Sequence, residues 1–85
     1  MSLLSVAEFN EAHQKALGCS PEYGSPVELS RPPRSRVQVS LYIEDEEFVG
    51  EAQNQKLARQ AAVDAALETP GRLPTRLRDH IDTMI

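Results

Sequence analysis

Residues 37–43 read Val-Gln-Val-Ser-Leu-Tyr-Ile, with an aliphatic side chain at every second position. This period of two is typical of a β-strand that buries one face and exposes the other. The next four residues, 44–47, are acidic, and Phe48 and Val49 then begin another apolar segment. The pattern predicts a β-hairpin with the acidic residues at its turn. Gly50 follows directly and predicts a bulge or the close approach of another element.

A shorter extended segment precedes the hairpin. Val27 and Leu29 alternate with Pro26, Glu28 and Ser30, which predicts a short strand. Pro26 indicates that this strand lies at a sheet edge, because proline cannot donate a ladder hydrogen bond. Residues 31–36 then read Arg-Pro-Pro-Arg-Ser-Arg, which predicts a stiff, basic and exposed loop. We therefore expect three strands in a meander.

A helix is predicted on the N-terminal side of these strands. Ser5 and Glu8 fit a capping box, apolar residues follow at helical spacing, and Gly18 suits the position just after a helix end. We expect this helix over about residues 6–17. Cys19, which comes next, is expected to be a small buried residue.

A second helix is predicted after the strands, over roughly residues 55–68, with Asn54 as its cap. Its alanines at positions 58, 61, 62 and 65 share one face, which allows close packing on a sheet. Residues 69–71, Thr-Pro-Gly, end this helix. In the tail, an apolar stripe with a spacing of four suggests a third short helix; it consists of Leu73, Leu77, Ile81 and Ile85.

This order predicts an α+β fold, α-β-β-β-α, in which a three-stranded antiparallel sheet carries two helices on one face. A length of 85 residues suits one domain and is too short for two. The domain is expected to span residues 5–68, followed by a C-terminal extension, 69–85, with the possible third helix. The apolar stripe of that extension is expected to pack on this domain or on a second copy.

The composition bears on the compartment. Cys19 is the single cysteine, so no intramolecular disulfide can form, no structural metal site is expected, and a reducing compartment is indicated. We expect no secretory signal at the N-terminus, and no apolar run approaches the ~20 residues of a membrane span. The expectation is an intracellular protein, cytoplasmic or nuclear, without membrane contact.

No pattern indicates an enzyme. The sequence has no Ser–His–Asp or Cys–His pairing in a motif context, no glycine-rich phosphate loop and no acidic pattern of a two-metal nuclease. His13 and His80 are expected to be packed or surface residues, and the acidic run a solubilising turn. We expect no catalytic residue, no metal, no cofactor and no small-molecule substrate.

The charge balance is acidic. Nine Lys and Arg residues oppose thirteen Asp and Glu residues, which gives a formal net charge of −4, whereas nucleic-acid binders are usually basic. In a meander, however, the 31–36 loop and the start of the second helix lie at one end of the sheet and the 44–47 turn lies at the other. Five of the nine basic residues are therefore expected at the loop end: Arg31, Arg34, Arg36, Lys56 and Arg59.

Two stretches resemble the double-stranded RNA-binding domain family. Residues 10–23 contain Asn-Glu-x-x-Gln-Lys and end in Pro-Glu-Tyr, which is similar to the family's first helix and following loop. Residues 47–52 and 55–67 are similar to its Phe-x-Gly third strand and its basic, alanine-rich second helix. The matches lie in the family's order within residues 5 to about 68. The resemblance implies the α-β-β-β-α fold and binding to double-stranded RNA.

The resemblance assigns RNA contacts to both helices. In the first helix it implies minor-groove contacts by Glu11 and Gln14, both of a residue type that the family uses. At the start of the second helix the family's three lysines fall on Gln55, Lys56 and Arg59, so two of the three charges remain. Binding of this kind senses the shape of the RNA helix more than its sequence.

The loop between the first two strands departs from the family. The family's Gly-Pro-x-His is replaced by Arg-Pro-Pro-Arg at residues 31–34, so the glycine and the histidine are lost. The resemblance still implies that Arg31, Arg34 or Arg36 reaches a groove or a phosphate.

A second hypothesis stays open, in which a domain of this fold acts as a protein-interaction or dimerisation module. The altered loop, the missing lysine at Gln55, the acidic balance and the extra apolar stripe favour it. Members of the resembling family use the fold for homodimers and for docking onto partner enzymes. The stripe formed by Leu73, Leu77, Ile81 and Ile85 would then be the interaction surface.

Overall fold

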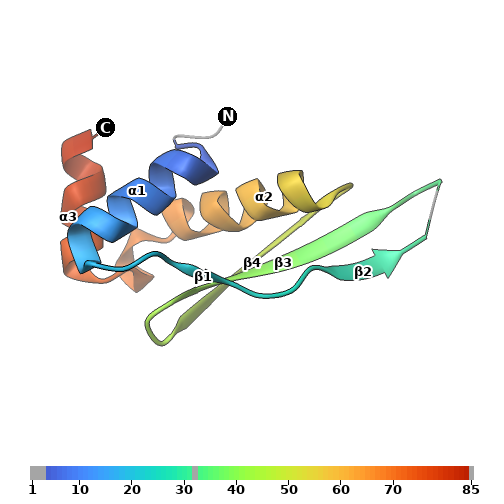
Figure 1. Cartoon of the computed structure of the whole chain (residues 1–85), viewed down its shortest axis with the longest axis horizontal. Helices are drawn as coiled ribbons and strands as arrows, with labels where there is room; N and C mark the ends of the chain where they lie inside the picture. Colours follow the sequence, from blue (N-terminus) through green and yellow to red (C-terminus); the bar gives the residue numbers. More distant parts are fainter. Residues whose placement is uncertain (1–3, 32, 85) are drawn as a thin grey trace.

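The computed structural model describes residues 4–31 and 33–84 of the 85-residue chain. Its elements are α1 (Val6–Leu17), β1 (Glu22–Tyr23), β2 (Val27–Ser30), β3 (Arg36–Ile43), β4 (Glu46–Ala52), α2 (Gln55–Glu68), the 3-10 helix η1 (Pro70–Arg72) and α3 (Thr75–Met84). Figure 1 shows α1 and α2 over one face of an antiparallel sheet, with the other face open. The α+β fold and both predicted helices are confirmed. No helix within the described residues is long and apolar enough to cross a membrane.

The sheet is organised around β3, which pairs with β4 on one side and with both β1 and β2 on the other. The β3–β4 hairpin keeps one register from Ile43 opposite Glu46 to Val37 opposite Ala52. Its turn is therefore only residues 44–45, and β4 starts at Glu46 rather than at Phe48 as the sequence predicted. The acidic residues 46–47 pair with β3 instead of forming a longer turn.

The first strand of the predicted meander is split, which the sequence did not predict. Tyr23 of β1 pairs with Leu41, and Val27 of β2 pairs with Gln38, so both segments run along the same edge of β3. Gly24 between them still donates a 2.8 Å hydrogen bond to the Ser40 carbonyl oxygen, whereas Pro26 has no N–H group to donate to the ladder. The sheet consequently has four strands, two of which share one edge.

The core lies between the sheet and the helices. Val39, Leu41 and Ile43 of β3 are buried, whereas Tyr42 between them is exposed, as the period of two predicted. Among the largest fully buried side chains are Phe9 of α1 and Phe48 of β4. On the α2 side the buried residues are Ala58, Ala62, Val63 and Ala66.

Gly50 is the position where β4 comes closest to α2. A Cβ atom at Gly50 would overlap backbone atoms of Ala58, Ala61 and Ala62. The strand keeps its register here, with Val39 opposite Gly50, so the glycine marks a close approach and not a bulge. The small-residue face of α2 therefore allows the helix backbone to lie directly on the strand backbone.

The tail packs on its own domain. Leu73, Leu77 and Ile81 belong to the same buried cluster as Phe9, and α3 lies against α1. These three residues are 7%, 0% and 5% exposed, so they do not form the exposed interaction surface that the second hypothesis expected. Ile85, the fourth residue of the stripe, lies outside the described residues. The sequence left packing on this domain or on a second copy open, and packing on this domain is observed.

Arg72 of η1 connects the tail to the β3–β4 hairpin. Its Nε donates a 2.8 Å hydrogen bond to Glu46 Oε2, and its Nη2 donates a 3.1 Å bond to the Glu47 carbonyl oxygen. The guanidinium carbon lies 4.8 Å from the centroid of the Phe48 ring. One charge of the acidic run is thus paired with a cation from the tail.

Both predicted helix starts have their caps, and the end of α1 corrects one expectation. Ser5 and Glu8 form the capping box. Hydrogen bonding to Ser5 lowers the pKa of the Glu8 carboxyl, and the Ser5 backbone N–H has a larger effect than the Ser5 hydroxyl. Gly18 adopts φ 79°, as a residue after a helix end often does.

Cys19 is exposed, so its expected burial is wrong. Its carbonyl oxygen lies 2.5 Å from Nδ1 of the buried His13.

Candidate nucleic-acid interface

The exposed face of α1 carries the first predicted contact region. Glu11 and Gln14 are both exposed and lie three residues apart, so they share a helix face. Glu11 pairs with Lys15 at 2.9 Å, and both side chains are more than 60% exposed. A solvated pair of this kind contributes little stability, and it leaves the Glu11 carboxylate able to exchange partners.

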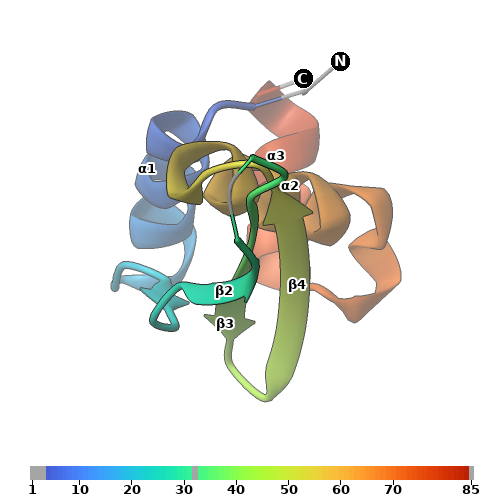
Figure 2. The same ribbon diagram turned by 90° about the vertical axis from the view of Figure 1, so that its right-hand side faces the viewer.

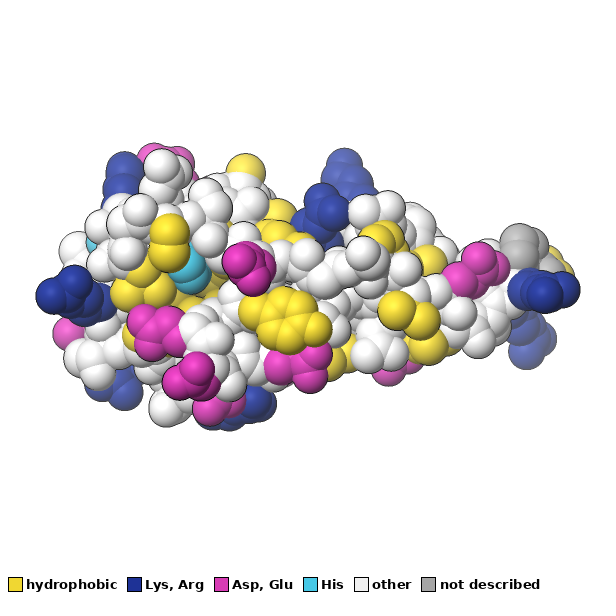
Figure 3. Space-filling view, turned by 60° about the horizontal axis from the view of Figure 1, so that its bottom comes forward, with side chains coloured by type: hydrophobic (Ala, Val, Ile, Leu, Met, Phe, Trp, Pro, Cys, Tyr) yellow, Lys and Arg dark blue, Asp and Glu magenta, His cyan; other side chains and the backbone are white. Residues whose placement is uncertain are grey.

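The β2–β3 loop carries the second region. Arg31, Arg34 and Arg36 are all exposed, and the Ser30 hydroxyl donates a hydrogen bond to the Arg34 carbonyl oxygen. This loop lies at the end of the sheet where α2 begins, and Figure 2 looks onto that end. Lys and Arg side chains gather at the corresponding right-hand tip in Figure 3.

The first turn of α2 carries the third region. Gln55 and Lys56 are exposed, and Arg59, one turn further on, is partly buried. The Asn54 side chain accepts a 2.9 Å hydrogen bond from the Leu57 N–H and so caps the helix. The remaining N–H groups of the first turn and the helix dipole favour a negative charge at this point.

Arg59 is held by contacts that the sequence did not reveal. Its guanidinium carbon lies 5.4 Å from the centroid of the Tyr23 ring, and its Nε is buried with no hydrogen-bond partner among the described residues. The Tyr23 hydroxyl donates a 2.7 Å hydrogen bond to Asn10 Oδ1. Burial raises the pKa of Tyr23 to about 12, although the nearby Arg59 charge acts in the opposite direction. The chain from Arg59 through Tyr23 to Asn10 therefore links α2, β1 and α1.

A groove separates the starts of α1 and α2. It measures about 480 Å³ and is lined by Ser5, Val6, Ala7, Asn10, Lys56, Leu57, Arg59 and Gln60. Gln60 fixes the spacing of the two helices, because its Oε1 accepts from the Val6 N–H at 3.1 Å and its Nε2 donates to the Leu4 carbonyl at 2.8 Å. Lys56 and Arg59 of the third predicted region thus line this groove, whereas Glu11 and Gln14 of the first region lie further along α1 and do not line it.

The basic loop and the acidic turn lie at opposite ends of the sheet, as the sequence predicted, but two acidic residues also lie near the basic end. Arg36 starts β3 and the 44–45 turn follows its end, so the basic loop and the acidic turn lie at opposite ends of this strand. Glu28 and Glu51, however, pair with residues near the loop end of β3. The loop end is therefore a mixed surface in which cations predominate.

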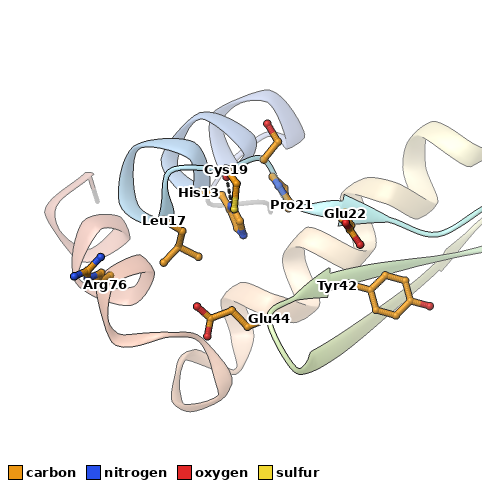
Figure 4. A pocket seen from close by; sticks show the side chains of 9 residues that line it. His13, Leu17, Cys19, Pro21, Glu22, Tyr42, Glu44 and Arg76 are labelled. Atoms are coloured by element: carbon orange, nitrogen blue, oxygen red, sulfur yellow. Dashed lines mark hydrogen bonds between the residues drawn. The ribbon is translucent and has the colours of Figure 1, made fainter.

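A second pocket lies at the other end of the domain, away from the predicted contacts. It measures about 590 Å³, and Figure 4 shows His13, Cys19, Glu44 and Arg76 around it. Its charges are of both signs. No group of three or more His, Cys, Asp and Glu side chains in the described part of the chain could hold a metal ion. This pocket does not present a recognisable catalytic arrangement.

Large apolar side chains are exposed elsewhere. Val27, Tyr42 and Val49 are 53%, 40% and 40% exposed, and their pairing register puts them on the open face of the sheet. Hydrophobic side chains are visible on this face in Figure 3. Sequence patterning did not identify these three residues as one surface. They come from three strands, and the pairing register that puts them side by side cannot be obtained from the pattern of each strand alone.

Neither a scan against protein-family models nor a search of curated proteins found a match to this chain. What the chain does must therefore be inferred from its residues and their geometry.

Proposed function

We propose that this chain is a non-catalytic module of the double-stranded RNA-binding domain type, which binds duplex RNA by its shape. The observation that carries the proposal is the position of the cationic first turn of α2 directly across a groove from α1. Lys56 and Arg59 line one side of this groove, and Asn10, on the same helix as Glu11 and Gln14, lines the other.

The chemistry of the two sides suits A-form RNA. Its minor groove is wide and shallow and displays 2′-hydroxyl groups, which the exposed Glu11 carboxylate and Gln14 amide can bind. The phosphates of the adjacent major groove suit Lys56, Arg59 and the free N–H groups at the start of α2. Arg34 and Arg36 would then contact the next stretch of backbone. An exposed thiol at Cys19 fits a reducing compartment such as the cytoplasm or the nucleus.

The affinity should be modest and sensitive to salt. The chain carries a net charge of −4, and Glu28 and Glu51 lie near the basic loop. Few phosphates are therefore neutralised, and each neutralised phosphate adds to the salt dependence.

The test is a fluorescence-anisotropy titration of a duplex of about 16 base pairs, the length that one such module spans. Lys56→Gln removes an exposed cation without disturbing packing, whereas Arg59 also packs on Tyr23. Lys56→Gln should weaken binding about three- to tenfold. It should also reduce by about one the number of phosphate contacts that the salt dependence of the binding constant reports. Arg76→Gln, an exposed arginine on α3, is the matched control and should bind like the wild type. Absence of binding at about 50 mM salt would refute the proposal.

A specific observation supports the second hypothesis, a protein-interaction or homodimerisation module. The open sheet face exposes Val27, Tyr42 and Val49, and it replaces the tail stripe as the apolar surface available to a protein partner. Analytical ultracentrifugation of the wild type and of a Val49→Thr variant separates the two functions. A dimer that Val49→Thr weakens supports the second hypothesis, whereas a monomer at all concentrations counts against homodimerisation.

A further inference from the structure

The groove between α1 and α2 holds polar groups that the fold itself does not use. The Tyr23 hydroxyl donates to Asn10 Oδ1, which leaves the Asn10 Nδ2 group as a donor without a hydrogen bond to any described residue. Arg59 Nε is buried and has no hydrogen-bond partner in the part of the chain that the structure describes, and the Lys56 side chain is exposed. The side chains of Asn10, Lys56 and Arg59 therefore all line one groove, and Gln60 hydrogen-bonds across it to residues 4 and 6.

The walls of the same groove are apolar. Val6 and Ala7 line it from α1, and Leu57, which is 44% exposed, lines it from α2. A volume of about 480 Å³ falls within the range of roughly 300–1,000 Å³ that is usual for ligand sites. A ligand that satisfies both the walls and the donors has a flat apolar part, hydrogen-bond acceptors and one anionic group.

We propose that this groove receives a single unpaired nucleotide of the bound RNA, so that the domain prefers a bulged duplex to a perfect one. The base packs between Leu57 and the α1 wall, its edge accepts a hydrogen bond from Asn10 Nδ2, and its phosphate lies at Lys56 and Arg59. This inference rests on the proposed RNA binding and adds the RNA feature that the site selects.

The position of the groove favours a nucleotide over an acidic peptide. Ala7 and Asn10 continue along α1 at helical spacing to Glu11 and Gln14, so an occupant of the groove is next to the proposed minor-groove contacts. A nucleotide carries its charge at the phosphate alone, whereas an acidic peptide along α1 would also meet Glu8 and Glu11. An unpaired base can leave the stack at a lower cost than a paired one, which makes a bulge the natural source.

The experiment compares a duplex of about 16 base pairs with the same duplex carrying one unpaired adenosine near its centre. The wild type should bind the bulged RNA about fivefold more tightly, at the lower end of what one packed base contributes. Leu57→Ala should abolish this preference, and its affinity for the perfect duplex should stay within about twofold of the wild-type affinity. Met84→Ala is the matched control, because Met84 is also helical and is 45% exposed but does not line the groove.

A second readout reports on the groove directly. In ¹⁵N-correlation spectra of the wild type, the bulged RNA should shift the Asn10 side-chain amide signals and the Val6 and Leu57 backbone signals more than the perfect duplex does. Equal binding of both RNAs would overturn this inference and leave the proposed function intact, whereas no binding of either RNA would overturn both. A preference for the bulge that survives Leu57→Ala, or groove shifts caused by an acidic peptide but not by the bulged RNA, would also overturn it.

Discussion

The backbone of Gly50 in β4 lies so close to α2 that a Cβ atom at Gly50 would overlap the amide nitrogen of Ala62. Both partners in this contact are backbone, so neither can move aside as a flexible side chain does. The contact sets the distance between the helix and the sheet, and with it the packing of Phe48 and Val63 between them.

We therefore expect Gly50→Ala to lower the free energy of unfolding by about 3 kcal/mol, at the upper end of typical overpacking penalties. Urea denaturation followed by circular dichroism measures the change. Gly71→Ala is the control, because a Cβ atom there meets nothing within 4 Å, and it should change stability by less than about 0.5 kcal/mol. Equal denaturation midpoints for the two variants would show that α2 adjusts its position freely.

The tail is expected to contribute to stability. Leu77 is fully buried in the cluster that also contains Phe9, so Leu77→Ala should cost about 2–5 kcal/mol through lost burial and a residual cavity. Met84→Ala, at an exposed position of the same helix, should cost less than about 0.5 kcal/mol. Sedimentation should show the same oligomeric state for both variants. A change in oligomeric state without a loss of stability would mean that the stripe serves an interface.

Tyr23 should make stability depend on alkaline pH. Burial favours the neutral phenol and raises its pKa from 10.0 to about 12, so the folded chain holds this proton more tightly than the unfolded chain. The resulting contribution to stability is complete below about pH 10 and is lost as the pH rises towards about 12. Urea denaturation across this range should show a smaller decline for Tyr23→Phe than for the wild type.

The same variant should also lose about 1 kcal/mol at neutral pH, because the 2.7 Å hydrogen bond to Asn10 disappears. Tyr42→Phe removes an exposed tyrosine and serves as the matched control. If the alkaline decline were the same in Tyr23→Phe and the wild type, another group would be its source.

The β3–β4 turn should accept a stabilising substitution. Glu44 has φ 53°, and among the described residues it is the one non-glycine residue with a positive φ. Glycine adopts this conformation without the Cβ penalty, so Glu44→Gly should raise the free energy of unfolding by about 0.5–1 kcal/mol after its larger unfolded-state entropy is counted. Asp45→Gly, at the neighbouring turn position, should be neutral or destabilising. Thermal denaturation distinguishes the two, and a lower midpoint for Glu44→Gly than for the wild type would contradict the prediction.

The parts of the fold that local chemistry determines could be predicted from the sequence. The caps at Ser5 and Asn54 and the glycine at Gly18 define the ends of α1 and the start of α2, and these bounds agree with the structure. The split edge strand was missed because its two segments are held by β3, a partner distant in sequence. The tail stripe predicted an apolar face but not what covers it, since helical spacing is the same for a core and for an interface.

The candidate site was predictable to a similar degree. Exposure of Lys56 and Gln14 follows from their helix faces, and both are exposed as expected. The contacts of Arg59 with Tyr23, and of Tyr23 with Asn10, join three elements and depend on tertiary packing. Sequence periodicity within one element carries no information on such contacts, so neither Asn10 nor Tyr23 was assigned a role.

The pairing of α1 with α3 has a consequence for the synthesis of the chain. Phe9 is translated early and Ile81 late, yet both belong to one buried cluster. While the ribosome is still making the helix that contains Ile81, the apolar face of α1 has no cover on that side and is open to chaperones or to other nascent chains. The domain should therefore complete its folding only after residue 81 has left the ribosomal exit tunnel, as one cooperative step and not element by element.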